Sequence, residues 1–291
     1  MSPHIVAVSS PSPMNSIPED GRSLIERPGF SYLPRFISAQ EAAALIEYFS
    51  AITPLWEQRH RDVDHGRPGE HSRRLTRPVY WLGAWQFACL GYYAEPDHRE
   101  DRCLRAEPFP DVMNTILDRL RPMLQAHDAS IEDVPNSCLI NYYGREVGKG
   151  PPRDYARLRM HRDGEPGPVV MFSIGQPGLL EFLDPDPDTG DEPELALWTR
   201  HRSVCILSGP DFKDRLYHRI AQVRFGDEPA IDSRLADFEA RRVSVSFRHV
   251  PEALISDFDA LSERSRTRIR DYVGELAEHS SHFRAQLERR P

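Results

Sequence analysis

The second half of the chain consists of short apolar runs, and this pattern constrains the fold more than any other feature. Each run is four to eight residues long and rich in β-branched and aromatic residues, which favour pleated strands. Turn-forming stretches such as Asp184–Gly190 separate the runs. The predicted strands are Cys138–Tyr143, Val169–Ile174, Leu179–Leu183, Leu195–Trp198, Val204–Leu207, Arg215–Ile220 and Val243–Val250. Several short strands separated by turns predict a sandwich or a barrel, so the expected fold class is α+β and mainly β.

The chain before these strands is predicted to be helical in two places. Ser38 and Glu41 have the spacing of a capping box, and the apolar residues of Ala42–Phe49 recur at helical spacing behind them. A second helix is predicted over Pro110–Arg121, where an apolar stripe follows a proline suited to a first turn. Pro122 is expected to end or kink this helix, because proline lacks the amide that the helix requires.

Both ends of the chain are expected to lie outside the β core. Residues 1–27 are predicted to be a disordered leader, since the first twenty are rich in Ser and Pro and lack the pattern of a signal peptide. A short strand is predicted at Gly29–Leu33. Residues 256–291 are predicted to be a helical tail that packs on the sheet or meets a partner, because apolar residues recur there at helical spacing among many charges.

Composition narrows the class of protein. No apolar run approaches the roughly 18 residues of a membrane span. The four cysteines form no CxxC pair, which argues against a zinc site and a disulfide framework and favours a cytoplasmic location. The net charge of −8 argues against a protein that coats nucleic acid through bulk charge. The stretch Arg59–Arg77 is basic, and it fits either a contact with an anionic partner or a solvated loop.

Two histidines and an aspartate form a candidate metal site. His161 and Asp163 are two residues apart, so at the end of a strand their side chains point to the same side. His218 lies 55 residues after Asp163 in an alternating run, on the same face as Leu216 and Ile220. Two histidines and a carboxylate are the facial triad of non-haem iron oxygenases. A zinc hydrolase uses similar ligands, and a lone histidine on an apolar face is more often a core residue.

Two arginines follow the candidate ligands. Arg242 and Arg248 are six residues apart, so on a regular strand they share a face with Ser244 and Ser246. An arginine on an inward face is costly unless it meets an anion. A carboxylate fits the guanidinium fork, so the expected ligand is the distal carboxylate of 2-oxoglutarate, whereas a zinc hydrolase would not need these arginines. The alternative is a surface strand with salt bridges.

From Cys138 to Val250 the chain resembles the AlkB family of Fe(II)/2-oxoglutarate dioxygenases, which oxidatively dealkylate nucleic acids. The motifs that carry the resemblance are Asn141-Tyr142-Tyr143, His161-Arg162-Asp163-Gly164-Glu165, Val170–Gly175, Tyr217-His218 and the run Arg242–Arg248. The resemblance implies a double-stranded β-helix (jelly roll) with N-terminal supporting helices. It further implies a dioxygenase domain over residues 28–255, with a nucleotide-recognition lid at about residues 57–105.

The resemblance also implies roles for individual residues. His161, Asp163 and His218 would bind Fe(II), and O2 would be the second substrate. The implied 2-oxoglutarate ligands are Asn141, Tyr143, Arg242 and Arg248. The implied substrate-binding residues are Glu165, Trp81, Trp85 and Arg74, although Trp85 and its neighbours also fit a buried strand.

The implied activity is oxidative dealkylation of N-alkylated bases in single-stranded DNA or RNA. The protein is expected to be a monomer. Ser244 stands where DNA repair members of the family carry Asn, and the acidic turn Asp184–Glu194 differs from a compact repair enzyme. These departures and the acidic net charge favour an alternative, in which the same oxygenase chemistry acts on a small molecule or a protein. A binding module that has lost its chemistry is the third hypothesis, and the complete ligand set argues against it.

Overall fold

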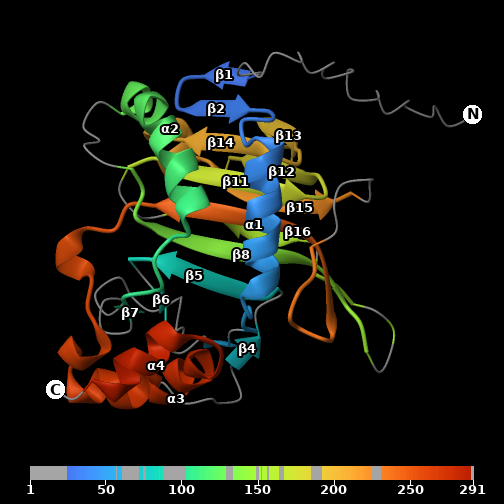
Figure 1. Cartoon of the computed structure of the whole chain (residues 1–291). Coiled ribbons are helices and arrows are strands. Elements are labelled where there is room, and N and C mark those ends of the chain that lie inside the picture. Colours follow the sequence, from blue (N-terminus) through green and yellow to red (C-terminus); the bar gives the residue numbers. More distant parts are fainter. Residues whose placement is uncertain are drawn as a thin grey trace, which may run out of the picture.

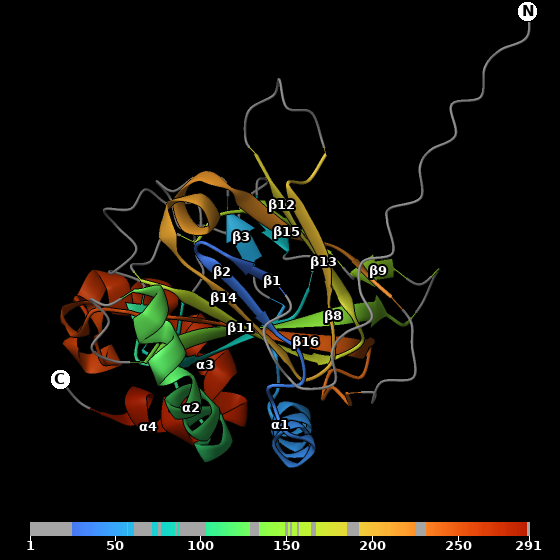
Figure 2. The ribbon, with the colours of Figure 1, turned by 90° about the horizontal axis from the view of Figure 1, so that it is seen from above.

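Two antiparallel β-sheets face one another in the computed structural model of the chain (Figures 1 and 2). The structure describes residues 25–56, 58–60, 72–74, 77–84, 86–87, 103–128, 134–148, 151, 153–155, 157–163, 167–184, 192–224 and 231–289. This arrangement confirms the double-stranded β-helix that the sequence predicts.

The large sheet has the strand order β1-β2-β14-β11-β16-β8-β5, with β9 paired to β8. Its strands are β1 (Ile25–Arg27), β2 (Phe30–Leu33), β5 (Val79–Gly83), β8 (Ser137–Glu146), β9 (Arg153–Tyr155), β11 (Val169–Gly175), β14 (Ser203–Leu207) and β16 (Phe238–Arg248). The small sheet has the order β10-β15-β12-β13, formed by β10 (Leu158–His161), β12 (Gly178–Leu183), β13 (Leu195–Thr199) and β15 (Tyr217–Val223). Two hairpins lie apart from both sheets: β3 (Gln58–His60) with β4 (Ser72–Arg74), and β6 (Gln86–Phe87) with β7 (Cys103–Leu104).

Two helices cover the outer face of the large sheet. The helices α1 (Ala39–Ala51) and α2 (Asp111–His127) lie on the side of this sheet opposite to β12, β13 and β15 (Figure 2). The predicted capping box of α1 is confirmed, because Ser38 Oγ accepts from the Glu41 amide at 3.1 Å and Glu41 Oε2 accepts from the Ser38 amide at 2.8 Å. The expected end of α2 at Pro122 is wrong. Pro122 is exposed and the helix continues, because the buried Leu124 anchors its last turn against the core.

The alternation along β16 separates two apolar cores. Val243, Val245 and Phe247 point into the core between the large sheet and the helices. A second core lies between the two sheets, where Leu180, Phe182 and Leu207 are buried with others. The opposite face of β16 therefore turns its polar residues toward the space between the sheets.

The helical tail is confirmed, but it consists of two helices, α3 (Glu263–His279) and α4 (Ser281–Glu288), where a single helix was expected. Ser280 divides them, because its backbone is extended and its hydroxyl caps α4 by accepting from the Phe283 amide. Two short 3-10 helices, η5 (Glu252–Leu254) and η6 (Phe258–Ala260), connect the tail to β16. The tail lies at the β5 end of the large sheet (Figure 1) and contributes buried residues to the main core.

Several boundaries differ from the predictions. The predicted leader lies outside the described residues up to position 24, and its last three residues form β1 because they pair with β2. A π-helix, η4 (Pro210–Arg215), occupies residues where a strand was expected to begin, so β15 starts at Tyr217. None of the described helices combines the length and the apolar character of a membrane-spanning segment.

Candidate metal centre and co-substrate pocket

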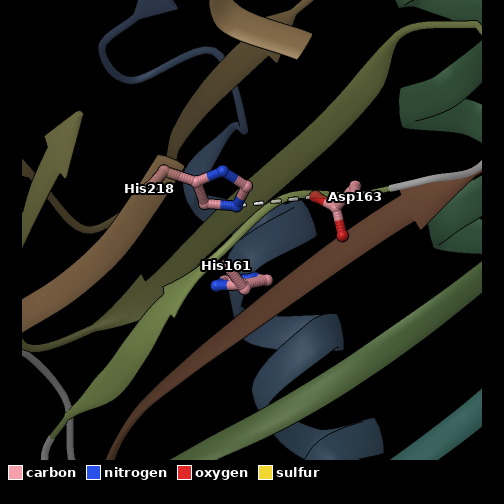
Figure 3. A group of neighbouring side chains, drawn as sticks. All are labelled: His161, Asp163 and His218. Atoms are coloured by element: carbon pink, nitrogen blue, oxygen red, sulfur yellow. Dashed lines mark ion pairs between the residues drawn. The ribbon is translucent and has the colours of Figure 1, made fainter. Parts of the chain in front are cut away.

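The three predicted metal ligands come together between the sheets. His161 is the last residue of β10, Asp163 follows it by two residues, and His218 lies on β15 directly opposite His161 in the register of the pair. One ligand atom from each residue lies within 4.8 Å of the others. Figure 3 shows the three side chains converging, with Asp163 Oδ2 at 3.5 Å from His218 Nε2. The geometry is that of a three-ligand site with a single carboxylate oxygen facing the histidines.

For His161 and Asp163, hydrogen bonds to one polar atom leave the other atom available to a metal ion. His161 Nδ1 lies 2.9 Å from the backbone carbonyl of Arg159, which leaves Nε2 for a metal ion. Arg248 donates to Asp163 Oδ1 through Nε at 3.0 Å and also through Nη2, which leaves Oδ2 free on the histidine side. A hydrogen bond to the remote atom of a ligand fixes its orientation and its tautomer.

The surroundings hold the ligands in the protonation states that bind metals. Burial lowers the pKa of His161 and lowers the pKa of His218 to about 3, so both rings are neutral at neutral pH. Burial alone would raise the pKa of the Asp163 carboxyl, but the charge of Arg248 and its hydrogen bond to the carboxylate lower this pKa well below its usual range. A neutral imidazole and an ionised carboxylate are the forms that coordinate a metal ion.

Arg242 lines the same cavity as the two histidines. The cavity is bordered by Tyr143, Leu158, His161, Met171, Ser173, Leu180, Thr199, His218, Ile220, Arg242, Ser244 and Ser246. The prediction that Arg242, Ser244 and Ser246 share an inward face is therefore confirmed.

The surroundings of Arg242 fit an anion. Its guanidinium is buried and donates to the carbonyls of Gln176 and Thr199 and to the hydroxyls of Ser173 and Thr199, at 2.8–3.2 Å. All of these acceptors are neutral, and within the described part of the chain no carboxylate pairs with Arg242 and its Nε lacks a hydrogen-bond partner. Burial lowers the pKa of the guanidinium, so an anionic ligand would offset the cost of burying its charge.

Asn141 and Tyr143 lie on β8, the strand that pairs with β16 beside Arg242 and Ser244. Tyr143 is opposite Arg242 in the register and its hydroxyl lies 3.4 Å from Ser244 Oγ, whereas Asn141 is opposite Ser244. Asn141 Oδ1 accepts from Arg77 Nε at 2.6 Å.

Arg77 was missed as a site residue because nothing in its sequence environment separates it from the other arginines of the basic stretch. Arg77 is 5% exposed, so the alternative of a solvated loop over Arg59–Arg77 does not hold for this residue. Burial of Arg77 follows from its place just before the buried strand β5.

The predicted substrate-binding residues are not brought together in the part of the chain that the structure describes. Glu165 and Trp85 lie outside the described residues, and Arg74 is the last residue of β4. Trp81 is 2% exposed and packs with Val79 and Leu139 in a small apolar cluster on β5 and β8. Its burial favours a packing role over stacking on a substrate.

Comparisons with known proteins agree with this geometry. A family model described as the 2OG-Fe(II) oxygenase superfamily matches residues 29–248, about three quarters of the chain. No curated protein matches. The chain is similar to a solved structure from rice titled "The structure of OsALKBH1", at 19% identity and a TM-score of 0.49, over 77% of this chain and 100% of that one. The family match covers the small sheet, every strand of the large sheet except β1, and all three metal ligands. The chain therefore belongs to the 2-oxoglutarate and Fe(II) dependent oxygenase superfamily, whose enzymes are dioxygenases that use Fe(II), 2-oxoglutarate and O2.

Proposed function

We propose that the chain oxidatively removes N-linked alkyl groups from bases of single-stranded DNA or RNA. The oxygenase chemistry follows from the family, and the AlkB-like motifs around the metal ligands motivate the choice of substrate. The observation that carries this choice is the group of exposed arginines beside the metal ligand His161.

Two segments of the described chain are rich in arginine, the β3–β4 hairpin and the residues around β10. In the register of the β3–β4 hairpin, the backbone of Arg59 lies directly opposite the backbone of Arg73. The hairpin lies at the β5 end of the large sheet (Figure 1), on the side where the small sheet lies (Figure 2). On β10 and around it, Arg157, Arg159 and Arg162 are exposed beside His161. A phosphate backbone is a partner that matches such an arrangement.

The residues of the site have separable roles in this reaction. His161, Asp163 and His218 would hold the iron, and Arg242 would bind the distal carboxylate of 2-oxoglutarate. When bound, these groups supply the oxidation of the alkyl carbon, which then leaves as an aldehyde. The apolar walls formed by Leu158, Leu180 and Ile220 would exclude water from the reacting centre. A single-stranded base can enter such a pocket without the cost of leaving a duplex.

The test is succinate formation by the Fe(II)-loaded protein with 2-oxoglutarate and O2, measured with a methylated single-stranded oligonucleotide and with the same oligonucleotide unmethylated. We expect turnover to rise only with the methylated strand, with the unmodified base restored in proportion to succinate. The Asp163→Ala variant is the control for the metal centre and should give no succinate. Turnover that is equal with both strands, with no base restored, would contradict the nucleic-acid substrate.

The alternative is the same chemistry on a small molecule or a protein. It is favoured by the net charge of −8 and by Ser244, whose short side chain lines the cavity where the repair enzymes of the resembled family carry Asn. Succinate formation that the oligonucleotides leave unchanged would direct the search to these substrates.

A further inference from the structure

The π-helix η4 lies directly before the third metal ligand. It spans Pro210–Arg215, and the amide of Leu216 closes it by donating to the carbonyl of Asp211 at 2.8 Å. π-Helical turns are rare, and they are found frequently at functional sites. Two residues after η4 ends comes Tyr217, and His218 follows on β15. A short segment of chain therefore carries both this unusual turn and one ligand of the metal centre.

Two contacts connect η4 with the turn that holds the other ligands. Lys213 Nζ donates to the backbone carbonyl of Asp163 at 3.0 Å. In the opposite direction, Arg162 Nη1 donates to the backbone carbonyl of Asp214. The Arg162 guanidinium also lies over the ring of Tyr217, at 4.7 Å from its centroid. Each segment therefore donates a cationic side chain to the backbone of the other.

Asp163 requires such support because it lies beyond the end of its strand. The strand β10 ends at His161 and, among the residues that the structure describes, pairs with β15 alone, so Asp163 lies beyond the ladder of backbone hydrogen bonds. Arg248 orients the carboxylate of Asp163, whereas Lys213 contacts its main chain. The two cations thus act on different parts of the same ligand.

The choice of lysine at position 213 is unusual in this chain. The sequence has 35 arginines and two lysines, Lys149 and Lys213. A lysine ammonium is compact and rotates freely, so it suits a single carbonyl in a narrow space, whereas the planar guanidinium suits paired acceptors. Lys213 is half-buried, which agrees with a fixed internal contact.

We infer that Lys213 is a positioning residue for the metal ligand Asp163, and that Arg162 completes a clamp between η4 and the His161–Asp163 turn. The clamp sets the distance between the first two ligands and His218, because η4 leads into β15 without an intervening loop. Removal of either the Lys213 contact or the Arg162 contact lowers the affinity of the three ligands for a divalent ion. The fold itself does not depend on the clamp.

The test uses Mn(II) as the probe ion, with its free concentration measured by electron paramagnetic resonance in the absence of 2-oxoglutarate. We expect Lys213→Met to weaken Mn(II) binding by about tenfold, the lower end of the range for residues that support a metal ligand. Lys213→Arg keeps a cationic donor in reach of the carbonyl and should restore part of the affinity, because the planar guanidinium fits a single acceptor less well than the ammonium. Arg162→Met should weaken binding too, and the double variant should lose less than the product of the single effects, because both residues brace one turn.

Two comparisons decide between positioning and a general role in stability. Arg121→Met removes a cationic side chain from an exposed ion pair on α2 and should leave Mn(II) binding unchanged. The thermal midpoint of each metal-free variant should stay close to that of the unaltered protein, whereas the rise in midpoint on adding Mn(II) should shrink for Lys213→Met and Arg162→Met. Unchanged Mn(II) affinity in Lys213→Met would overturn the inference. So would a lowered metal-free midpoint that Lys213→Arg fails to restore.

Discussion

At the scale of single residues, a conservative substitution of Arg242 is expected to weaken co-substrate binding more than a conservative substitution elsewhere in the cavity. Its guanidinium holds four neutral acceptors at once, and a lysine ammonium cannot reproduce this planar fork. We expect Arg242→Lys to weaken 2-oxoglutarate binding by about 1.5–3 kcal/mol, or roughly 10- to 150-fold. Calorimetric titration of the Mn(II)-loaded protein with 2-oxoglutarate measures this loss. Mn(II) affinity should be unchanged, and normal 2-oxoglutarate binding would contradict the assignment of Arg242.

Gly178 lies against the same guanidinium. A Cβ at this position would lie 2.8 Å from Arg242 Nε and 2.9 Å from its Cζ, so Gly178→Ala must displace the arginine. We expect this variant to bind 2-oxoglutarate about tenfold more weakly in the same titration, because the charged hydrogen bond loses its geometry. Gly148→Ala is the matched control, since nothing lies within 4 Å of a Cβ there. Equal affinity in the two variants would show that the pocket tolerates movement of Arg242.

At the scale of elements, the start of α1 links a helix cap to an ion pair. Glu41 closes the capping box and accepts a hydrogen bond from Arg119 Nη1 of α2 at 2.6 Å, so one carboxylate connects both helices. The Arg119 hydrogen bond lowers the pKa of Glu41 to about 2 from an ordinary value of 4.5. A carboxyl whose pKa is lower in the folded state stabilises the fold above its unfolded pKa and loses this effect as pH falls.

We therefore expect Glu41→Gln to lower the free energy of unfolding by about 1 kcal/mol at pH 7. The difference from the unaltered protein should be constant above about pH 5 and should shrink as pH falls from 4.5 toward 2. Urea unfolding at a series of pH values measures it. Glu47→Gln, at an exposed position of the same helix, is the control and should change the free energy of unfolding little at pH 7. A difference that is independent of pH would mean that the carboxylate charge contributes nothing.

At the scale of the whole molecule, the C-terminal helices are part of the main core. Ile269, Val273 and Phe283 are fully buried in the cluster that α1, α2 and the large sheet share. The tail also contacts the residue that follows β7, because Gln286 Nε2 donates to the carbonyl of Arg105 at 2.7 Å. These contacts favour a tail that unfolds together with the sheet.

We expect Phe283→Ala to cost about 3–5 kcal/mol of unfolding free energy, the usual range for truncating a buried phenylalanine. Unfolding should remain a single transition when far-ultraviolet circular dichroism and tryptophan fluorescence are followed together. Glu278→Ala, at an exposed position of α3, should cost little. Two separate transitions in the unaltered protein would mean that the tail is an independent unit.

Local patterns in the sequence predict the main core strands, the start of α1 and the residue types of the site. Alternation along Val243–Phe247 and around His218 predicts which side chains face inward, because a strand turns successive residues to opposite faces. The capping box at Ser38 predicts where α1 begins, because both partners lie within one turn. Local patterns of this kind need no knowledge of the rest of the fold.

The contacts that join distant segments depend on tertiary packing, and no local pattern in the sequence predicts them. Arg77 lies among many arginines in the sequence, and its burial against Asn141 depends on where β5 pairs with β8. Pro122 continues its helix because the core holds Leu124. The bond from Lys213 to Asp163 spans 50 residues and depends on a π-helix that no periodicity predicts. Periodicity reports the direction of a side chain, whereas its partner is set by how the sheets and helices pack.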